Sequence, residues 1–247
     1  MELNRRTYQC FRTREGRDVL FGRRVTNNGM WQQAPWSESF VNILGDSHPR
    51  PKYQSRMKML WDEEGLYVAS KMEDPELYAT QTQRNSFIWQ FDPDFEVFLK
   101  PSRVAANYYE FEVNCRNTVF ELTLSKPYAE GGVATHGTNL PSLRSEVHID
   151  GDLENQPRGW ELIVFFPFRD LFNLLEHDKT TSWPRASQVW QMNASRVHWR
   201  TVKDPVTSKS IRDPSYRNWG EHHAHRLSDN SAAVPNTLRS SLYRRRV

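Results

Sequence analysis

The sequence predicts an all-β protein, a β-sandwich of the jelly-roll type with one short helix and irregular ends. Many short segments alternate apolar and polar residues with the two-residue period of a strand. Turn-forming Pro, Gly, Asn and Asp residues separate these segments. The length of 247 residues fits a single all-β domain, and aromatic residues, at 13% of the chain, must supply much of its core because aliphatic residues are sparse.

Residues 94–99 and 108–114 show the clearest alternation and are expected to be neighbouring strands. Successive side chains of a strand point to opposite faces. One face of the expected pair is apolar and consists of Phe95, Val97, Leu99, Tyr109, Phe111 and Val113. The other face carries acids and an amide among aromatic rings, namely Asp94, Glu96, Phe98, Tyr108, Glu110, Glu112 and Asn114.

The remaining elements are read in chain order from the same periodicity. Residues 57–62 and 66–72 form an expected hairpin around the turn 62–65. Further strands are expected at 118–124, 143–149, 159–166 and 189–199. Residues 167–176 form the one expected helix, because Pro167 suits a first turn and three leucines fall on one side.

These elements divide the chain into three expected parts. Residues 1–30 form an N-terminal extension that could include an edge strand, residues 31–220 form the β-sandwich, and residues 221–247 form a disordered basic tail. The net charge is +3, with the basic excess at the two ends. Such basic runs can hold nucleic acid or anionic membrane, but they are more often solvated tails, so we expect no nucleic-acid partner. The protein is expected to be a monomer.

Cysteine content and hydropathy place few further limits on function. Cys10 and Cys115 cannot build a disulfide scaffold, and two free thiols are expected. The first residues contain no hydrophobic run, so no secretory signal is expected there, and no stretch is long and apolar enough for a membrane span. Localisation is left unassigned.

A longer series of segments, taken in order, resembles one family. The series runs through 31–36, 58–69, 92–98, 108–114, 117–119, 126–132, 159–168 and 193–199. Over residues 7–219 the chain resembles the family 9 carbohydrate-binding modules and their family 9-like relatives. The resemblance implies a β-sandwich and non-catalytic binding of a mono- or oligosaccharide, or of a polysaccharide chain end, in the context of polysaccharide breakdown.

The chain departs from the family pattern in three places. The family's opening strand is replaced by residues 21–29, and Ala129 stands where the family usually has an Arg that donates to sugar hydroxyls. After Trp219 the sequence Gly-Glu-His-His-Ala-His replaces the usual closing strand. The last two differences affect positions that the resemblance associates with ligand contacts.

The resemblance also implies that two aromatic rings hold a terminal sugar between them. Trp89 is the first candidate, with Phe91 as the alternative, and Trp89 could equally pack in the core. Trp219 or Trp199 is the candidate for the second ring.

Polar candidates complete the expected site. Glu96 and Asn114 could bond hydroxyls, or each could pair with a basic residue across the sheet. Asp94 could bond a hydroxyl, cap a turn or bind calcium. The loop residues Lys126, Tyr128 and Glu130 lie where binding residues often occur, although they could equally form a structural turn.

No cofactor is required by this interpretation, and calcium is the one ion considered. Calcium prefers several oxygen ligands, for which Asp74, Asp92 and Asp94 are available, but without the spacing of a calcium loop.

Two other classes of function are considered. A glycoside hydrolase needs two carboxyl groups on either side of the scissile bond, whereas Asp94 and Glu96 project in parallel from one strand. A haem-binding sandwich would need Met or His ligands, and the chain offers Met57, Met59, Met72, Met192 and the histidines of 222–225. Methionine on a strand is more often core filling.

Overall fold

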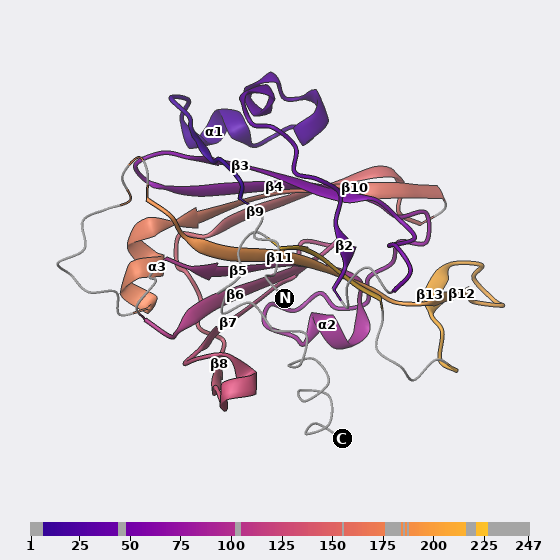
Figure 1. Cartoon of the computed structure of the whole chain (residues 1–247). Coiled ribbons are helices and arrows are strands. Elements are labelled where there is room, and N and C mark those ends of the chain that lie inside the picture. Colours follow the sequence, from indigo (N-terminus) through magenta and orange to yellow (C-terminus); the bar gives the residue numbers. More distant parts are fainter. Residues whose placement is uncertain are drawn as a thin grey trace.

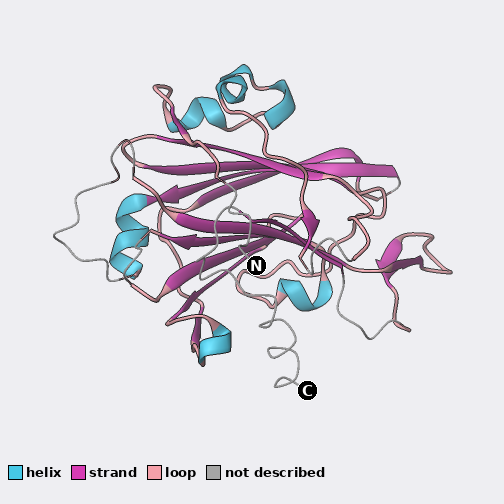
Figure 2. Cartoon of the chain, viewed as in Figure 1, coloured by secondary structure: helices cyan, strands magenta, loops and turns pink. Residues whose placement is uncertain are grey.

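The computed structural model describes residues 7–43, 48–101, 105–154, 156–175, 184, 186, 188–215 and 221–226. Two sheets of mainly antiparallel strands pack face to face, which confirms the all-β sandwich (Figures 1 and 2). Over the described residues, sheet A has the strand order β1 (Phe11–Arg12), β3 (Ser55–Trp61), β4 (Gly65–Glu73), β10 (Gln156–Pro167) and β9 (Arg144–Asp152). No described helix is both long and apolar enough to cross a membrane.

Sheet B carries the two polar strands at its centre. Its strand order is β2 (Val41–Asn42), β14 (Glu221–Arg226), β11 (Gln191–His198), β5 (Asp94–Lys100), β6 (Tyr108–Asn114), β7 (Val119–Leu124) and β8 (Ala134–His136). A small ribbon of β12 (Thr201–Lys203) and β13 (Ser210–Arg212) lies beside the sandwich (Figure 1). The helical segments are α1 (Arg17–Leu20), η1 (Val25–Asn27), η2 (Gly29–Gln33), α2 (Ile88–Phe91), η3 (Tyr128–Glu130) and α3 (Phe168–Leu174).

The expected hairpin is confirmed as β3 and β4, and its turn shows why these residues form it. Asp62 Oδ1 accepts hydrogen bonds from the backbone N–H groups of Glu64 and Gly65, at 2.8 and 3.0 Å. Position 65 has no room for a larger residue, because an added Cβ would lie 2.4 Å from the carbonyl oxygen of Phe166. The predicted helix is also confirmed, as the shorter α3.

The main core lies between the two sheets and contains the apolar face predicted for β5 and β6. Phe95, Val97 and Leu99 of β5 pack there with Tyr109, Phe111 and Val113 of β6, and all six are fully buried. The four methionines considered as haem ligands also lie in this core, where they fill space between the sheets. Cys10 and Cys115 are both free thiols, as expected.

The N-terminal segment covers the outer face of sheet A rather than extending away from the sandwich. Leu20, Val25 and Trp31 pack on that face in a second apolar cluster. The indole Nε1 of Trp31 donates to the Leu20 carbonyl at 3.1 Å, and the Lys58 ammonium of β3 donates to the Trp31 carbonyl at 3.0 Å. The expected boundary at residue 30 therefore falls inside this covering layer, while β1 is an edge strand of sheet A.

Arg24 fastens the covering layer to sheet A, and its loss should loosen that layer. Its guanidinium lies 3.1 Å from Asp150 and 3.2 Å from the buried carboxylate of Glu161. Arg24→Ala should lower the free energy of unfolding by about 1–2 kcal/mol, because the buried Glu161 carboxylate loses a charged partner. The partial exposure of Arg24 limits the size of this loss. Urea unfolding followed by Trp fluorescence measures this change. Arg23→Ala, at an exposed position, is the matched control and should change little; equal losses in both variants would contradict the assignment.

The C-terminal part requires a correction. Residues 221–226 were expected to begin a disordered tail, but they form β14, which pairs with β11 on one side and β2 on the other. The boundary expected at residue 221 therefore coincides with the start of a sheet strand. Trp219 and residues 227–247 lie outside the described residues.

Candidate functional site

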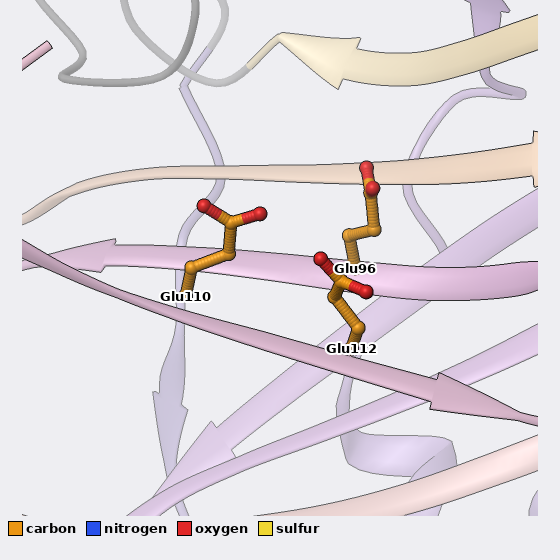
Figure 3. A group of neighbouring side chains, drawn as sticks. All are labelled: Glu96, Glu110 and Glu112. Carbon is orange, nitrogen blue, oxygen red and sulfur yellow. The ribbon is translucent and has the colours of Figure 1, made fainter. Parts of the chain in front are cut away.

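The outer face of sheet B brings three glutamates together. Strand register places Glu96 of β5 directly opposite Glu112 of β6, and Phe98 opposite Glu110. Residues that face each other across two strands share one side of the sheet. Figure 3 shows all three glutamate side chains rising from this face. One carboxylate oxygen from each lies within 4.8 Å of the others, and we call Glu96, Glu110 and Glu112 the glutamate cluster.

The glutamate cluster is nearly closed to solvent. Glu112 is 2% exposed, Glu96 5% and Glu110 8%. Burial, followed by the charges of Asp94, Glu110 and Glu96, raises the pKa of Glu112 well above its ordinary value. The Ser195 hydroxyl of β11 donates to Glu96 Oε2. The cluster therefore attracts a proton, a hydrogen-bond donor or a cation more strongly than isolated surface glutamates would.

Several buried oxygen atoms of this face have no hydrogen-bond partner among the described residues. They include Glu112 Oε2 and Oδ1 of Asn193, which is 4% exposed. Asn193 lies on β11 opposite Phe98 and two residues before Ser195, and so shares the outer face. Buried polar oxygens are normally satisfied, and a hydrogen-bond donor such as a hydroxyl group would satisfy these atoms.

Aromatic side chains adjoin the glutamate cluster on the same face. Phe120 of β7 lies opposite Glu112 in the strand register. The Phe120 ring is 5.5 Å from the Phe87 ring and 5.6 Å from the His136 ring, and Phe87 and His136 are 5.5 Å apart. Phe87 is 42% exposed. We call Phe87, Phe120 and His136 the ring group; it offers an exposed aromatic surface beside the carboxylates.

The predicted aromatic residues occupy different environments. Trp89 of α2 is partly buried and, like Tyr128, packs against an apolar cluster that includes Phe98 and Phe120. Phe91 is 47% exposed at the end of α2. Trp199 is 1% exposed, and its ring is covered by the Arg212 guanidinium at 3.6 Å, so it has no open face for a sugar.

Asn114 is not available as a hydroxyl ligand. Its Nδ2 donates to the Gln81 carbonyl and to Asp92 Oδ2, both at 2.8 Å. Its Oδ1 accepts from the N–H groups of Arg116 and Thr118, both at 3.0 Å. These four bonds use the full capacity of the amide, which therefore fastens a loop to the end of β6.

The three aspartates considered for calcium each have partners within the fold. Asp92 accepts bonds from Thr80 and Gln81, and Asp74 pairs with Arg196 at 2.6 Å. Asp94 Oδ1 accepts from the Val197 N–H at 3.3 Å. Within the described ranges, the one set of three or more converging acidic, His or Cys ligand atoms is the glutamate cluster.

The loop candidates are only partly associated with this face. Tyr128 packs against the apolar cluster beside the glutamates, whereas Glu130 is exposed and Lys126 is half-buried. The loop takes its shape from Gly132, since a Cβ there would lie 1.8 Å from the Lys126 carbonyl oxygen. The Pro/Gly-rich segment is thus a tight structural turn that carries Tyr128.

The predicted site did not include Glu110, Glu112 or Phe87. The alternation of residues 108–114 already placed both glutamates on the polar face. Their convergence with Glu96 depends on the β5–β6 register. Phe87 has no comparable signal, because it becomes part of this surface through its contacts with β7 and β8.

The described residues form an antiparallel sandwich, which is the fold that the family resemblance implied. One outer sheet face of this sandwich carries the acids and aromatic rings described above. Residues 25–136 match the family described as carbohydrate family 9 binding domain-like, which confirms the resemblance for the segment that holds the glutamate cluster. A search of curated protein sequences finds no match.

Solved structures share the fold at low identity. A protein of Bacteroides uniformis ATCC 8492, proposed to bind carbohydrate, is 13% identical with a TM-score of 0.61, and the match covers 89% of this chain and 88% of that one. A family 9 module of Caldicellulosiruptor kristjanssonii solved with glucose is 13% identical with a TM-score of 0.51, covering 94% of this chain and 100% of that one. The same type of module solved with cellotriose is 14% identical with a TM-score of 0.51, covering 94% and 98%.

Proposed function

We propose that this protein is a non-catalytic carbohydrate-binding module that binds a mono- or oligosaccharide on the outer face of sheet B. The glutamate cluster, located inside the family-matched segment, is the observation that carries the proposal. Modules of similar fold have been solved with glucose and with cellotriose. A role in polysaccharide breakdown is the expected context.

The chemistry of the face suits a sugar. Carboxyl oxygens accept hydrogen bonds from hydroxyl donors, and an aromatic ring can stack on the apolar C–H face of a pyranose. The glutamate cluster provides the acceptors and the exposed Phe87 ring provides a stacking surface. Because each glutamate is less than a tenth exposed, a bound sugar would approach the carboxylates from the side of the exposed Phe87 ring.

The arrangement supports binding better than hydrolysis. Glycosidases place their two carboxyl groups on either side of the scissile bond, about 5–5.5 Å apart in retaining enzymes and about 6.5–9.5 Å in inverting ones. Here the three carboxylates rise from one sheet face and come within 4.8 Å of one another. Asp94, the other acid considered, is fully buried.

A glycan array probed with the full chain tests the proposal. We expect binding to glucose-containing oligosaccharides without release of reducing sugar. A folded protein that binds none of the arrayed glycans would overturn the proposal, and sugar release abolished by Glu96→Gln would establish hydrolysis instead.

Phe87→Ala should weaken oligosaccharide binding while leaving the fold intact. An aromatic contact contributes about 0.5–1.5 kcal/mol, so Kd should rise about 2- to 12-fold. Phe11→Ala is the matched control, because Phe11 is 39% exposed at the edge of sheet A. Isothermal titration calorimetry with cellotriose measures both variants, and unchanged affinity in Phe87→Ala would remove the ring group from the site.

A further inference from the structure

Asn85 has an uncommon backbone conformation two residues before the exposed Phe87 ring. Its φ is +63°, in the left-handed region, which Gly adopts freely and Asn more readily than most other residues. Among the described residues, the other non-glycine positions with positive φ are Asn117 and Ser208. Because such a conformation persists where the surrounding contacts hold it, the contacts of Asn85 indicate what it fastens.

Three hydrogen bonds fasten Asn85 to the edge of sheet B. Its backbone N–H donates to the Val119 carbonyl of β7 at 2.8 Å. Its Oδ1 accepts from the Glu121 N–H at 3.3 Å, and its Nδ2 donates to Asn139 Oδ1 at 3.1 Å. The backbone and the amide of Asn85 therefore dock this segment onto β7 and onto the loop that follows β8.

The docked segment brings Phe87 to the ring group. The two β7 residues that Asn85 bonds are the neighbours of Phe120 in the chain, and the Phe87 ring lies 5.5 Å from the Phe120 ring. Phe87 is 42% exposed, whereas Ile88, the next residue, is fully buried in the apolar cluster under α2. The segment is thus anchored on both sides of Phe87, while the ring itself faces solvent.

We propose that Asn85 is a positioning residue that holds the Phe87 ring in place for stacking on a sugar. This inference rests on the proposed function, in which Phe87 supplies the stacking surface. A ring that is fixed before the ligand arrives loses less conformational entropy on binding. Because Asn85 acts through Phe87, its loss should cost no more affinity than loss of the ring, about a 2- to 12-fold rise in Kd.

Asn85→Gly tests the amide without straining the backbone, since Gly accepts a positive φ and removes both side-chain bonds. In calorimetry with cellotriose we expect Kd to rise up to about 12-fold. We expect no further rise when Asn85→Gly is added to Phe87→Ala, because the two residues act as a unit. Asn85→Asp keeps an acceptor for the Glu121 N–H and should restore part of the affinity. Equal losses with and without the Phe87 ring would contradict the proposal.

Asn117→Gly is the matched control. Asn117 has a φ of +61°, and its amide also makes two bonds, from Nδ2 to the Ser145 carbonyl at 3.1 Å and to Oδ1 from the Ser145 hydroxyl at 2.7 Å. These bonds fasten the turn after β6 to sheet A instead of the Phe87 segment. Asn117→Gly should therefore lower the melting temperature about as much as Asn85→Gly without changing Kd. Circular dichroism verifies that each variant is folded.

NMR of the sugar-free chain tests the positioning separately from binding. Nuclear Overhauser contacts between Phe87 and the other two rings of the ring group should weaken in Asn85→Gly and persist in Asn117→Gly. Cellotriose binding by the wild type, together with unchanged Phe87 contacts in Asn85→Gly, would overturn this proposal alone. A folded wild-type chain that binds no sugar would overturn the proposed function and this proposal together.

Discussion

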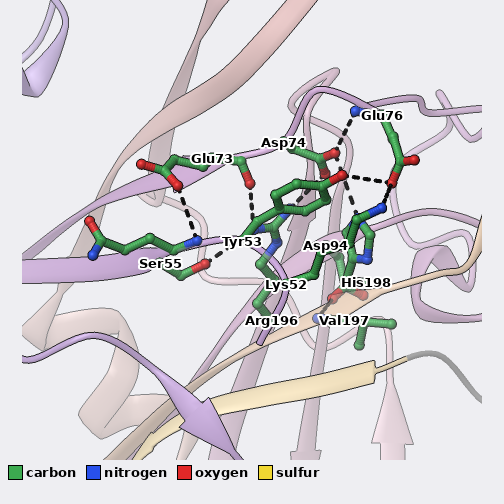
Figure 4. A network of polar contacts seen from close by, with 11 residues as sticks. Lys52, Tyr53, Ser55, Glu73, Asp74, Glu76, Asp94, Arg196, Val197 and His198 are labelled. Carbon is green, nitrogen blue, oxygen red and sulfur yellow. Dashed lines mark hydrogen bonds and ion pairs between the residues drawn. The ribbon is translucent and has the colours of Figure 1, made fainter. Parts of the chain in front are cut away.

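Replacing Asp74 by Asn should lower the free energy of unfolding by about 3–5 kcal/mol, because it leaves the buried Arg196 guanidinium without its counter-charge. Both side chains are 0% exposed, and Arg196 Nη2 lies 2.6 Å from Asp74 Oδ2. Arg196 Nη1 also donates to the Ser55 hydroxyl at 3.2 Å and to the Glu73 carbonyl at 2.9 Å (Figure 4). Arg196 belongs to sheet B while Ser55 and Glu73 belong to sheet A, so this network joins the two layers.

Two comparison variants separate the ion pair from general effects of substitution. Asp18→Asn removes an exposed acid and should change stability little. The double variant Asp74→Leu with Arg196→Met removes both charges and should be less destabilised than Asp74→Asn, because no charge is then left buried. Chemical denaturation measures all three. A loss below about 1 kcal/mol in Asp74→Asn would contradict the proposed role of the pair.

The same pair predicts how stability changes in acid. Burial alone would raise the pKa of Asp74, but the Arg196 charge, His198 and the Glu76 N–H together lower it. A lowered folded-state pKa means that the ionised group contributes stability above its unfolded pKa of about 3.9. That contribution is lost as the pH falls through the folded pKa. The wild type should therefore lose stability below about pH 4 more steeply than Asp74→Asn.

Glu96→Gln should weaken sugar binding about 10- to 150-fold, the range expected when a hydrogen bond to a charged group is lost, about 1.5–3 kcal/mol. The amide can still accept the Ser195 hydroxyl, which limits the effect on the fold. Calorimetry with cellotriose measures the change, with Glu15→Gln as the exposed control. Unchanged affinity in Glu96→Gln would place the sugar away from the glutamate cluster.

The sandwich could be predicted because its central strands carry their own pattern. Val97 and Phe111 alternate with acids along β5 and β6, and this alternation correctly separated the core face from the outer face. In contrast, β14 has no apolar alternation. It is a strand because β11 and β2 pair with its backbone on both sides, which the side-chain pattern of residues 221–226 does not reveal.

The candidate site was harder to predict because it depends on contacts between distant segments. Asn114 lay on the predicted polar face, but the Gln81 and Asp92 segments close over it and use its amide. Trp199 likewise had the right residue type, yet Arg212 of β13 covers its ring. Strand alternation identifies a face, whereas these contacts decide which residues on that face remain accessible.

Chemical-shift mapping by NMR tests most directly whether carbohydrate binds at the outer face of sheet B. Uniformly labelled protein is titrated with cellotriose while its assigned backbone amides are followed. We expect the largest shift changes in β5, in β6 and around Phe87. Absence of shift changes at saturating sugar, or changes confined to the outer face of sheet A, would contradict the account.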